Sequence, residues 1–572
     1  MLAAVMIFVS LPTTRTSALP NYDNYKVRVG LAYGSNEKGV ATLQVASGTG
    51  TGFKAGYVDP SNDEFKPYYT VNCTKVDVIR DYGMNYNVYS GSYVYDGADA
   101  NSCVGRWHIE IQVNYDNQSE LDAAVSAAYG ATGYVSFPAF TQSGYRVRIG
   151  RFTSSSAANE DKDTILQRLN ATSKFATVTV STVASGSNGY TVVESGTRNI
   201  LFEWDGATKP LALQATGGSA PETYMKTVSG TTVLTHRYHG VMDFGSSSSN
   251  SMSVINVVPL GLYIRGVVPY EIGMGYPDES TKAMAVIAAT FAVYNEGRHS
   301  SYGVDVCTGQ HCQVYRGIGS SSKRYETQQI IDCCNAVDGM VITYNGKPIQ
   351  AVYHASNGGF TEDCENVWVA EIPYLKSIID EYEGTTEGAT AAQNGVWSKT
   401  LTGEQIASRL KSYGLGTVTS VEVTKRSAAG SVVELSVSDG SKTVVLKKED
   451  MRLKMGTDVL LSQNFKVLHE GSVYVNDGVQ LESGLSGAYV MGADGVAVAL
   501  PDTARTVLTA DGQTVVNDAS GGANEWTFDG KGWGHSLGLS QWGAIGMGRK
   551  GFTFDQIIKY YYTGVEISGF DY

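Results

Sequence analysis

The sequence predicts a multidomain α+β protein with a strand-rich central region, and three observations lead to this prediction. The chain has 572 residues, which is more than one hydrophobic core organises and corresponds to about three or four units of roughly 100 to 200 residues. Short stretches that alternate apolar and polar residues run along most of the chain, as in strands, whereas helical patterns occupy a few segments. The 65 Gly and 36 Tyr, against 13 Pro, also suit short strands and turns.

The composition argues against one large class of partner. A net charge of −13 disfavours contact with a phosphate backbone, because affinity for nucleic acid depends on Lys and Arg. The hydrophobic fraction of 42% and the charged fraction of 17% are typical of globular protein. We therefore expect globular units that do not bind nucleic acid.

The first residues have the features of a targeting segment. Residues 2–11 form an apolar run of signal-peptide length, and Thr-Ser-Ala ending at Ala18 offers a small-residue cleavage site. No Lys or Arg precedes Arg15, so the usual positive start is missing. We expect residues 1–19 to be a signal peptide or an anchor. The protein would then be exported to the cell wall or the extracellular space, with membrane contact only through an uncleaved N-terminus.

Alternating patterns divide the N-terminal half into two regions. Residues 20–104 predict a small β-rich region. Residues 105–195 predict a βαββαβ order with strands at 108–113, 134–137, 145–150 and 176–180 and helices at 118–128 and 161–169. This order, with the stretch Tyr145-Arg-Val-Arg-Ile-Gly-Arg-Phe, resembles the SPOR domain, which implies binding to peptidoglycan strands stripped of peptide stems. Unrelated ferredoxin-like modules share the order, so a plain spacer is the alternative.

Three further regions follow. In residues 196–395 an Ala-rich helix is predicted at 279–296, with Asp278 as its N-cap and Gly297 at its end. Residues 396–522 predict a β-rich insertion with one amphipathic segment at 402–413. Residues 523–572 are dense in Gly and aromatic residues and end in a predicted helix at 553–561. We expect this last region to complete the fold of 196–395.

Four motifs in the central and last regions resemble the SpoIID/LytB family. They are Val-Val-Pro-Tyr-Glu ending at Glu271, Val-Tyr-His-Ala-Ser-Asn-Gly-Gly at 352–359, the stretch from Val-Trp to Pro-Tyr-Leu-Lys at 367–376, and Gly-Trp-Gly-His to Gln-Trp-Gly-Ala at 532–544. The resemblance implies a role in peptidoglycan metabolism, in sporulation or wall remodelling. The family includes lytic transglycosylases that act on denuded glycan and also members regarded as amidase activators, so two functions stay open.

Glu271 is the candidate catalytic acid/base. Cleavage of a glycosidic bond needs a proton for the leaving oxygen, and a transglycosylase uses the substrate's own C6 hydroxyl as nucleophile to form a 1,6-anhydro sugar. One carboxylate can serve both steps. Glu271 follows Val-Val-Pro and precedes a Gly-rich loop, where apolar neighbours would raise its pKa. A surface Glu in a turn is the alternative.

The resemblance also implies substrate-binding residues. Aromatic rings suit the faces of pyranose sugars, and a Lys suits the lactyl carboxylate of N-acetylmuramate. A solvated Lys, a strand Tyr or a packed His is the alternative in each case. The candidates are Lys282, Tyr344, Tyr374, Lys376 and His535.

The sequence departs from the family pattern beside the candidate acid. Family members commonly have Ala-Arg-Thr where this chain has Ala288, Ala289 and Thr290, and Ser and Pro where it has Tyr270 and Gly273. The Arg replaced by Ala289 favours the competing function, a noncatalytic wall-binding protein that activates an amidase.

Four residues within a short stretch have the side chains of a zinc site. Thiolate and imidazole groups in this number suit tetrahedral Zn²⁺, and four protein ligands leave no position for a reactive water. We expect a structural zinc; a Cys307–Cys312 disulfide is the alternative. Pairing of the other five cysteines stays open, with Cys73–Cys103 and Cys364 with Cys333 or Cys334 as possibilities. The predicted ligands are His299, Cys307, His311 and Cys312.

Overall fold

The computed structural model describes most of the chain. The described residues are 22–46, 50–80, 84–87, 92–95, 104–184, 189–206, 209–217, 222–227, 234–245, 251–320, 322–383, 395–469, 489–491, 497–499, 505–509, 512–516 and 524–569. The predicted targeting segment 1–19 and Cys103 lie outside these residues. Within the described part of the chain, no helix is both long and apolar enough to cross a membrane.

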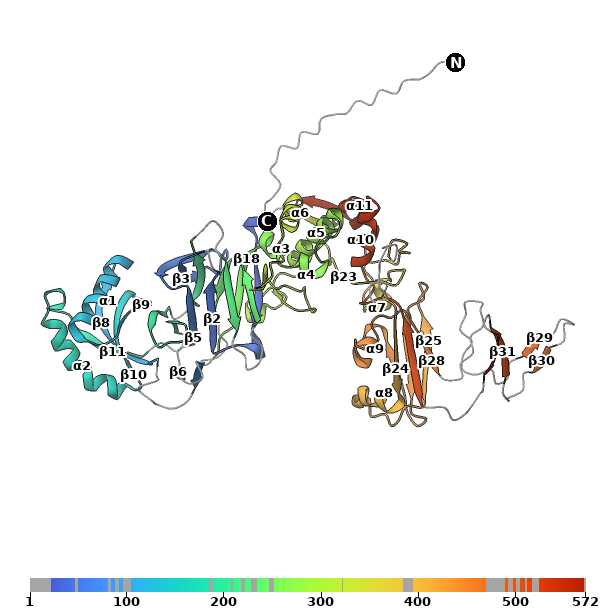
Figure 1. Cartoon of the computed structure of the whole chain (residues 1–572), viewed down its shortest axis with the longest axis horizontal. Coiled ribbons are helices and arrows are strands. Elements are labelled where there is room, and N and C mark those ends of the chain that lie inside the picture. The colour runs from blue at the N-terminus through green and yellow to red at the C-terminus, as the bar shows by residue number, and fades with distance from the viewer. Residues whose placement is uncertain are drawn as a thin grey trace, which may run out of the picture.

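The architecture is mixed α/β, strand-rich and built from several units, in agreement with the predicted fold class. Figure 1 shows a small module with α1 and α2 at one end, then strands of two sheets, a helical region, and the unit containing α8 and α9, with the short strands β29, β30 and β31 beyond it. The sheets and the helical region share one large hydrophobic cluster, whereas the unit with α8 and α9 has its own.

The first sheet joins segments that are far apart in sequence. Its strand order is β19 (Val306–Cys307), β1 (Lys26–Ala32), β18 (Val254–Pro259), β17 (Val241–Asp243), β14 (Ala212–Thr216), β3 (Gly52–Val58) and β4 (Phe65–Val71). The strands therefore do not follow the predicted boundary between residues 20–104 and 196–395. These two segments form one structural unit, because long-range pairing, which local alternation does not reveal, places β1 between β18 and β19.

The second sheet has eleven strands. Their order is β11 (Val180–Ala184), β8 (Trp107–Tyr115), β10 (Gly144–Phe152), β9 (Ser136–Thr141), β13 (Ile200–Asp205), β12 (Tyr190–Glu194), β5 (Lys75–Arg80), β2 (Val40–Val45), β15 (Thr223–Thr227), β16 (Leu234–Tyr238) and β20 (Gly319–Ser320). The module predicted at 105–195 supplies one end of this sheet, and its β9 pairs in parallel with β13. The module is thus continuous with the rest of the sheet.

The βαββαβ order of this module agrees with the sequence prediction. Helix α1 (Gln118–Thr132) is capped by the Asn117 side chain, and α2 (Ser155–Asn170) by the Ser154 side chain, each accepting a backbone N–H of the first turn. The last strand starts at Val180, later than predicted. The reason is a 3₁₀ turn at Ser173–Phe175, which buries Phe175 before the strand begins.

The helical region is organised around one buried helix, α5 (Asp278–Tyr294). Its residues from Ser280 to Val293 are almost all buried, and it packs against α6 (Gln328–Ala336), β21 (Met340–Tyr344), α10 (Gln541–Arg549) and α11 (Phe554–Tyr561). The predicted N-cap is displaced by one residue, because Pro277 is the N-cap and Asp278 lies in the first turn. Helices α10 and α11 belong to the last region, so the chain returns to this core at its end.

Residues between the two parts of this core form a separate unit. One sheet contains β24 (Trp397–Thr402), β33 (Glu525–Gly530) and β28 (Phe465–His469), and another contains β25 (Ser420–Arg426), β26 (Val432–Ser438) and β27 (Thr443–Lys447). Helices α8 (Gly403–Arg409) and α9 (Lys448–Met455) accompany them. Because β33 pairs with β24, the unit extends to Gly530, one strand beyond the predicted boundary at 522.

The remaining elements are short. They are α3 (Leu260–Arg265), α4 (Val268–Glu271), α7 (Cys364–Val367), β22 (Lys347–Pro348), β23 (Tyr353–His354), β34 (Leu539–Ser540), β35 (Glu566–Gly569) and the hairpins β6 (Met84–Asn87) with β7 (Ser92–Tyr95), β29 (Tyr489–Met491) with β30 (Ala497–Ala499), and β31 (Arg505–Thr509) with β32 (Gly512–Val516). The parallel pair β23 and β34 matters most for function, since it brings two of the four family motifs side by side.

Candidate functional site

Glu271 is the last residue of the short helix α4, and the Gly-rich loop 272–277 joins it to α5. Pro269 fits the start of α4 because its missing N–H is not needed there. Val268 and Pro269 are buried, and the backbone N–H of Glu271 bonds to the Val267 carbonyl at 3.1 Å. The local sequence therefore fixes the backbone of Glu271 against the core while its side chain stays partly exposed.

The carboxylate of Glu271 accepts hydrogen bonds from three different parts of the chain. Oε1 accepts the backbone N–H of Val314 at 2.7 Å, and Oε2 accepts Nε2 of Gln541 at 3.2 Å. The Tyr353 hydroxyl donates a third. Burial raises the pKa of Glu271, and these three hydrogen bonds oppose the rise without cancelling it. The environment is the one expected from the Val-Val-Pro motif.

Tyr353 connects Glu271 to a chain of hydrogen bonds that includes Gln313 and Tyr263. Nε2 of Gln313 lies 3.3 Å from the Tyr353 hydroxyl, and Oε1 of Gln313 accepts the Tyr263 hydroxyl at 2.9 Å. The Tyr263 ring in turn stacks on Tyr315, with ring centres 5.1 Å apart. Sequence reasoning missed Gln313, Tyr353 and Gln541, although Tyr353 and Gln541 lie inside two of the recognised motifs.

The four predicted metal ligands come together. Their ligand atoms all lie within 4.8 Å of one another, and Cys312 Sγ lies 3.4 Å from His299 Nε2 and 3.6 Å from His311 Nδ1. A hydrogen bond from the Cys312 thiol, the largest influence, lowers the pKa of Cys307. A set of two sulfurs and two ring nitrogens converging in this way fits a tetrahedral Zn²⁺ site.

The metal-ligand cluster and the carboxylate share one short segment. Cys312 is followed by Gln313, which bonds to the Tyr353 hydroxyl, and by Val314, whose N–H bonds to Glu271. Anything that fixes Cys312 therefore also fixes two of the groups that orient the carboxylate or its tyrosine neighbour.

Two predicted substrate-binding residues, Lys282 and His535, have other neighbours. Nζ of Lys282 pairs with Oε1 of Glu279 at 2.6 Å, and the described residues around it include no contact that joins it to Glu271. The ring of His535 packs against His354 and Trp368, at 5.5 and 5.4 Å between ring centres. Burial lowers the pKa of His535 well below its usual value, so the ring stays neutral.

The other three predicted substrate-binding residues lie in two further places. Tyr344 at the end of β21 contacts the Tyr374 ring, with centres 5.6 Å apart, and the Tyr374 hydroxyl accepts the Gln350 N–H at 2.9 Å. Lys376 pairs with Glu371 at 2.9 Å and Glu365 at 3.3 Å. Within the described residues, the structure does not gather these side chains around Glu271.

Comparisons with known proteins bear on the segment that contains this geometry. Residues 248–344 match the SpoIID family model, described as stage II sporulation protein. Stage II sporulation protein D of Bacillus subtilis (strain 168) is 29% identical over 336 residues, which cover 56% of this chain and 77% of that protein. The segment 248–344 is therefore similar to the SpoIID family, and stage II sporulation protein D is a relative of this chain.

Two further relatives extend the comparison. Stage II sporulation protein D of Bacillus amyloliquefaciens is 28% identical over 333 residues, covering 56% of this chain and 78% of that protein. The amidase enhancer of Bacillus subtilis (strain 168) is 26% identical over 320 residues, covering 54% of this chain and 40% of that protein. The relatives of this chain therefore include both stage II sporulation protein D and the amidase enhancer.

Ala289, at the position where SpoIID proteins commonly carry an Arg, is enclosed by the core in this chain. Ala289 is fully buried in α5, and the next residue, Thr290, accepts the backbone N–H of Ile342 at 2.9 Å. Nearby, the Tyr270 ring packs against Tyr325, with centres 4.9 Å apart. The helix thus packs as an apolar element at the position where the family pattern has a charge.

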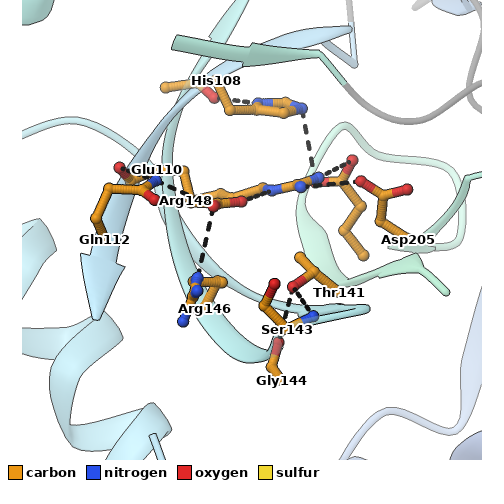
Figure 2. A network of polar contacts seen from close by, with 11 residues as sticks. His108, Glu110, Gln112, Thr141, Ser143, Gly144, Arg146, Arg148 and Asp205 are labelled. Atoms are coloured by element: carbon orange, nitrogen blue, oxygen red, sulfur yellow. Dashed lines mark hydrogen bonds and ion pairs between the residues drawn. The ribbon is translucent and has the colours of Figure 1, made fainter. Parts of the chain in front are cut away.

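The βαββαβ module lies outside the SpoIID match, and together with β13 it carries a charged network on one sheet face (Figure 2). Arg148 is 2% exposed and pairs with Glu110 at 2.9 Å, Glu203 at 2.9 Å and Asp205 at 3.0 Å. Arg146 lies 3.6 Å from Glu110. A cavity of about 420 Å³ opens over this face and is lined in part by Glu110, Arg148 and Asp205.

Proposed function

We propose that this protein is an exported peptidoglycan lytic transglycosylase. It cleaves the bond between N-acetylmuramate and N-acetylglucosamine in denuded glycan strands and leaves 1,6-anhydro-N-acetylmuramate ends. The observation that supports this most is the carboxyl of Glu271, which has a raised pKa and is oriented by Val314, Tyr353 and Gln541. The relatives named for sporulation favour a role in sporulation or wall remodelling.

The proposed reaction uses Glu271 twice. In its neutral form Glu271 donates a proton to the glycosidic oxygen as the bond to C1 breaks and positive charge develops on the sugar ring. The resulting carboxylate then takes the proton of the C6 hydroxyl, whose oxygen forms a new bond to C1. Protons balance, because the one that leaves Glu271 is replaced by the one from the C6 hydroxyl.

The raised pKa and the hydrogen bonds have separate tasks in this scheme. Burial keeps Glu271 protonated to a higher pH than an exposed Glu, which favours the first step. The Val314 N–H and the Gln541 amide stabilise the carboxylate that forms after proton transfer. Both contacts also fix the direction of the carboxyl group, which lowers the cost of reaching the reactive geometry.

We propose a structural Zn²⁺ at His299, Cys307, His311 and Cys312. The two thiols and two imidazoles fit its ligand preferences, and a four-ligand shell leaves no place for substrate. When bound, the ion would cross-link the segments that carry its four ligands, and it would take no part in the reaction. The ion would fix the backbone of Gln313 and Val314, since these two residues follow Cys312 in the sequence.

We propose that the SPOR-like module binds the same glycan strands. The βαββαβ order and the polar sheet face with its cavity support this assignment. The protein would then hold a strand at one site and cleave it at another.

The second candidate function is a noncatalytic wall-binding activator of an amidase. Ala289 in place of the family Arg favours it, as does the similarity to the amidase enhancer. In this case the surface around Glu271 would bind glycan without cleaving it, and partners would include another wall hydrolase.

One experiment separates the two functions. Purified protein is incubated with denuded glycan strands, and 1,6-anhydromuramyl ends are measured by mass spectrometry for the wild type, Glu271→Gln and Glu404→Gln, an exposed Glu of α8. We expect product from the wild type and Glu404→Gln and a strong loss for Glu271→Gln. No anhydro product from the wild type would exclude the transglycosylase, and equal product from Glu271→Gln would exclude Glu271 as the acid.

A further inference from the structure

The loop that carries His299 and Cys307 is tied to the N-terminal strand β1. Strand β19 pairs in parallel with β1, and Gly30 lies opposite Cys307 in this pairing. Strand β1 lies far outside the segment 248–344 that matches the SpoIID model. The surroundings of Cys307 therefore come partly from a strand outside the segment that matches the family model.

Asp305 fastens this loop at two points. Its Oδ2 accepts the backbone N–H of Arg28 at 2.8 Å, and its Oδ1 accepts the N–H of Gly297 at 2.9 Å. The N–H of Asp305 in turn bonds to the Arg28 carbonyl at 2.8 Å. One carboxylate thus joins the start of the loop, two residues before His299, to β1 beside Cys307.

Arg28 reinforces the same connection through its side chain. Its Nε donates to the Gly303 carbonyl at 2.7 Å, in the middle of the loop. Its Nη1 pairs with Asp63 at 2.8 Å and its Nη2 with Asp243 at 2.6 Å. Since Asp243 is only 4% exposed, its ion pair holds the guanidinium group of Arg28 against the sheet. The loop is held there too, because the same group donates to the Gly303 carbonyl.

Tyr33, just beyond β1, covers the ligands. Its ring lies 5.6 Å from the His299 ring and 5.3 Å from the Tyr302 ring, centre to centre, and its hydroxyl bonds to the Cys307 sulfur. A side chain at Gly30 would meet the Tyr33 ring, because a Cβ there would lie 2.6 Å from it. Tyr33, Tyr302 and Cys307 also line a cavity of about 350 Å³.

We propose that Tyr33 and Asp305 are positioning residues of the metal centre, which keep His299 and Cys307 in place and slow the loss of the ion. This inference rests on the proposed zinc site. Side chains that orient metal ligands typically change metal affinity by about 10- to 100-fold when they are mutated. Tyr33 acts on the sulfur and on the open side of the site, and Asp305 acts on the loop backbone.

The test measures metal retention in the full chain. Zinc content is determined by elemental analysis, and release of zinc to an excess of a chromogenic chelator is followed over time for the wild type, Tyr33→Phe, Asp305→Asn and Tyr302→Phe. Tyr302→Phe is the matched control, since it removes a neighbouring hydroxyl that has no hydrogen bond to a proposed ligand among the described residues. We expect release about 10-fold faster for Tyr33→Phe and Asp305→Asn and unchanged for the control.

The possible results distinguish this inference from the zinc assignment. Wild-type protein without zinc would overturn the metal site itself. Zinc bound with equal release from the wild type and Tyr33→Phe would overturn the role of Tyr33 alone, and acceleration of the same size in Tyr302→Phe would do so as well. Cobalt substitution gives a second readout that does not depend on release: the thiolate absorption band is expected to shift in Tyr33→Phe and to stay in place in Tyr302→Phe.

Discussion

The backbone N–H of Val314 lies 2.7 Å from Oε1 of Glu271, although the two residues are separated by the whole of α5 and the metal-ligand loop. Val314 also follows Cys312, a proposed zinc ligand, by two positions. The acid of the proposed reaction and the proposed metal centre are therefore mechanically connected through three consecutive residues, Cys312, Gln313 and Val314.

Tyr353→Phe is expected to move the pH dependence of cleavage to higher pH. The proton donor must be protonated, so activity falls as pH rises through the raised pKa of Glu271. The Tyr353 hydroxyl is one of the groups that lower this pKa, and its removal raises the pKa further. The initial rate of anhydro-product formation is measured from pH 4 to about 9. A descending limb that stays in place or moves to lower pH would contradict the prediction.

Glu271→Gln is expected to reduce the cleavage rate by about 10²- to 10⁴-fold, the usual contribution of a general acid/base. Gln has the same shape and cannot deliver a proton. Retained folding is checked by circular dichroism and the thermal transition, so that lost activity reflects chemistry. A residual rate within about 10-fold of the wild type would argue for another proton donor.

Removal of zinc is expected to lower both stability and activity. An ion at 100 times its dissociation constant stabilises the folded state by about 2.7 kcal/mol, and without it the Cys312–Val314 segment loses its anchor. The thermal transition and the cleavage rate are measured before chelation, after it and after zinc is restored. Cys307→Ser and Cys312→Ser should each reduce bound zinc, and unchanged stoichiometry in both would refute these ligands.

Ala289→Arg is expected to destabilise the protein without raising activity. Ala289 is fully buried in α5, and an unpaired buried charge costs about 3 to 5 kcal/mol. Ala289→Met is the control, since it adds similar length without charge. The free energy of unfolding should fall more for Arg than for Met. Higher activity with unchanged stability in Ala289→Arg would show that the family Arg fits this site after all.

Arg148→Met is expected to destabilise the βαββαβ module. Arg148 pairs with Glu110, Glu203 and Asp205, and its loss would leave three neighbouring carboxylates without their shared partner, at a cost of about 3 to 5 kcal/mol. Chemical unfolding is compared with Lys174→Met, an exposed control. Equal stability of the two variants would mean that the network is not important for folding.

Local features of the sequence predicted much of the fold and part of the site. The βαββαβ order and helix α5 each arise within a short stretch, so periodicity was sufficient for them. His299, Cys307, His311 and Cys312 also lie in one short stretch, and their convergence follows the expectation, while the zinc itself stays a prediction. Glu271 was found through its motif. The pairing of β1 with β18 and β19 and the arrival of Tyr353 and Gln541 at Glu271 depend on contacts between distant segments, which local patterns do not encode.

The candidate substrate-binding residues show that membership of a motif does not predict which side chains lie together. Lys282, Tyr344, Tyr374, Lys376 and His535 were grouped because each lies in a motif, yet in the described residues they occupy separate places. A motif can mark a packing position as well as a contact with substrate. His535, packed between His354 and Trp368, is the clearest example.

Gln541 lies far behind Glu271 in the sequence, which has a consequence for when the surroundings of Glu271 are completed. Synthesis begins at the N-terminus, so Glu271, the metal-ligand loop and Tyr353 are all made before Gln541 and the helices α10 and α11. A growing or truncated chain therefore holds the acid without one of its three hydrogen-bond donors and without part of the core around α5. The complete arrangement around Glu271 therefore forms only after α10, which carries Gln541, has been made and has packed against α5.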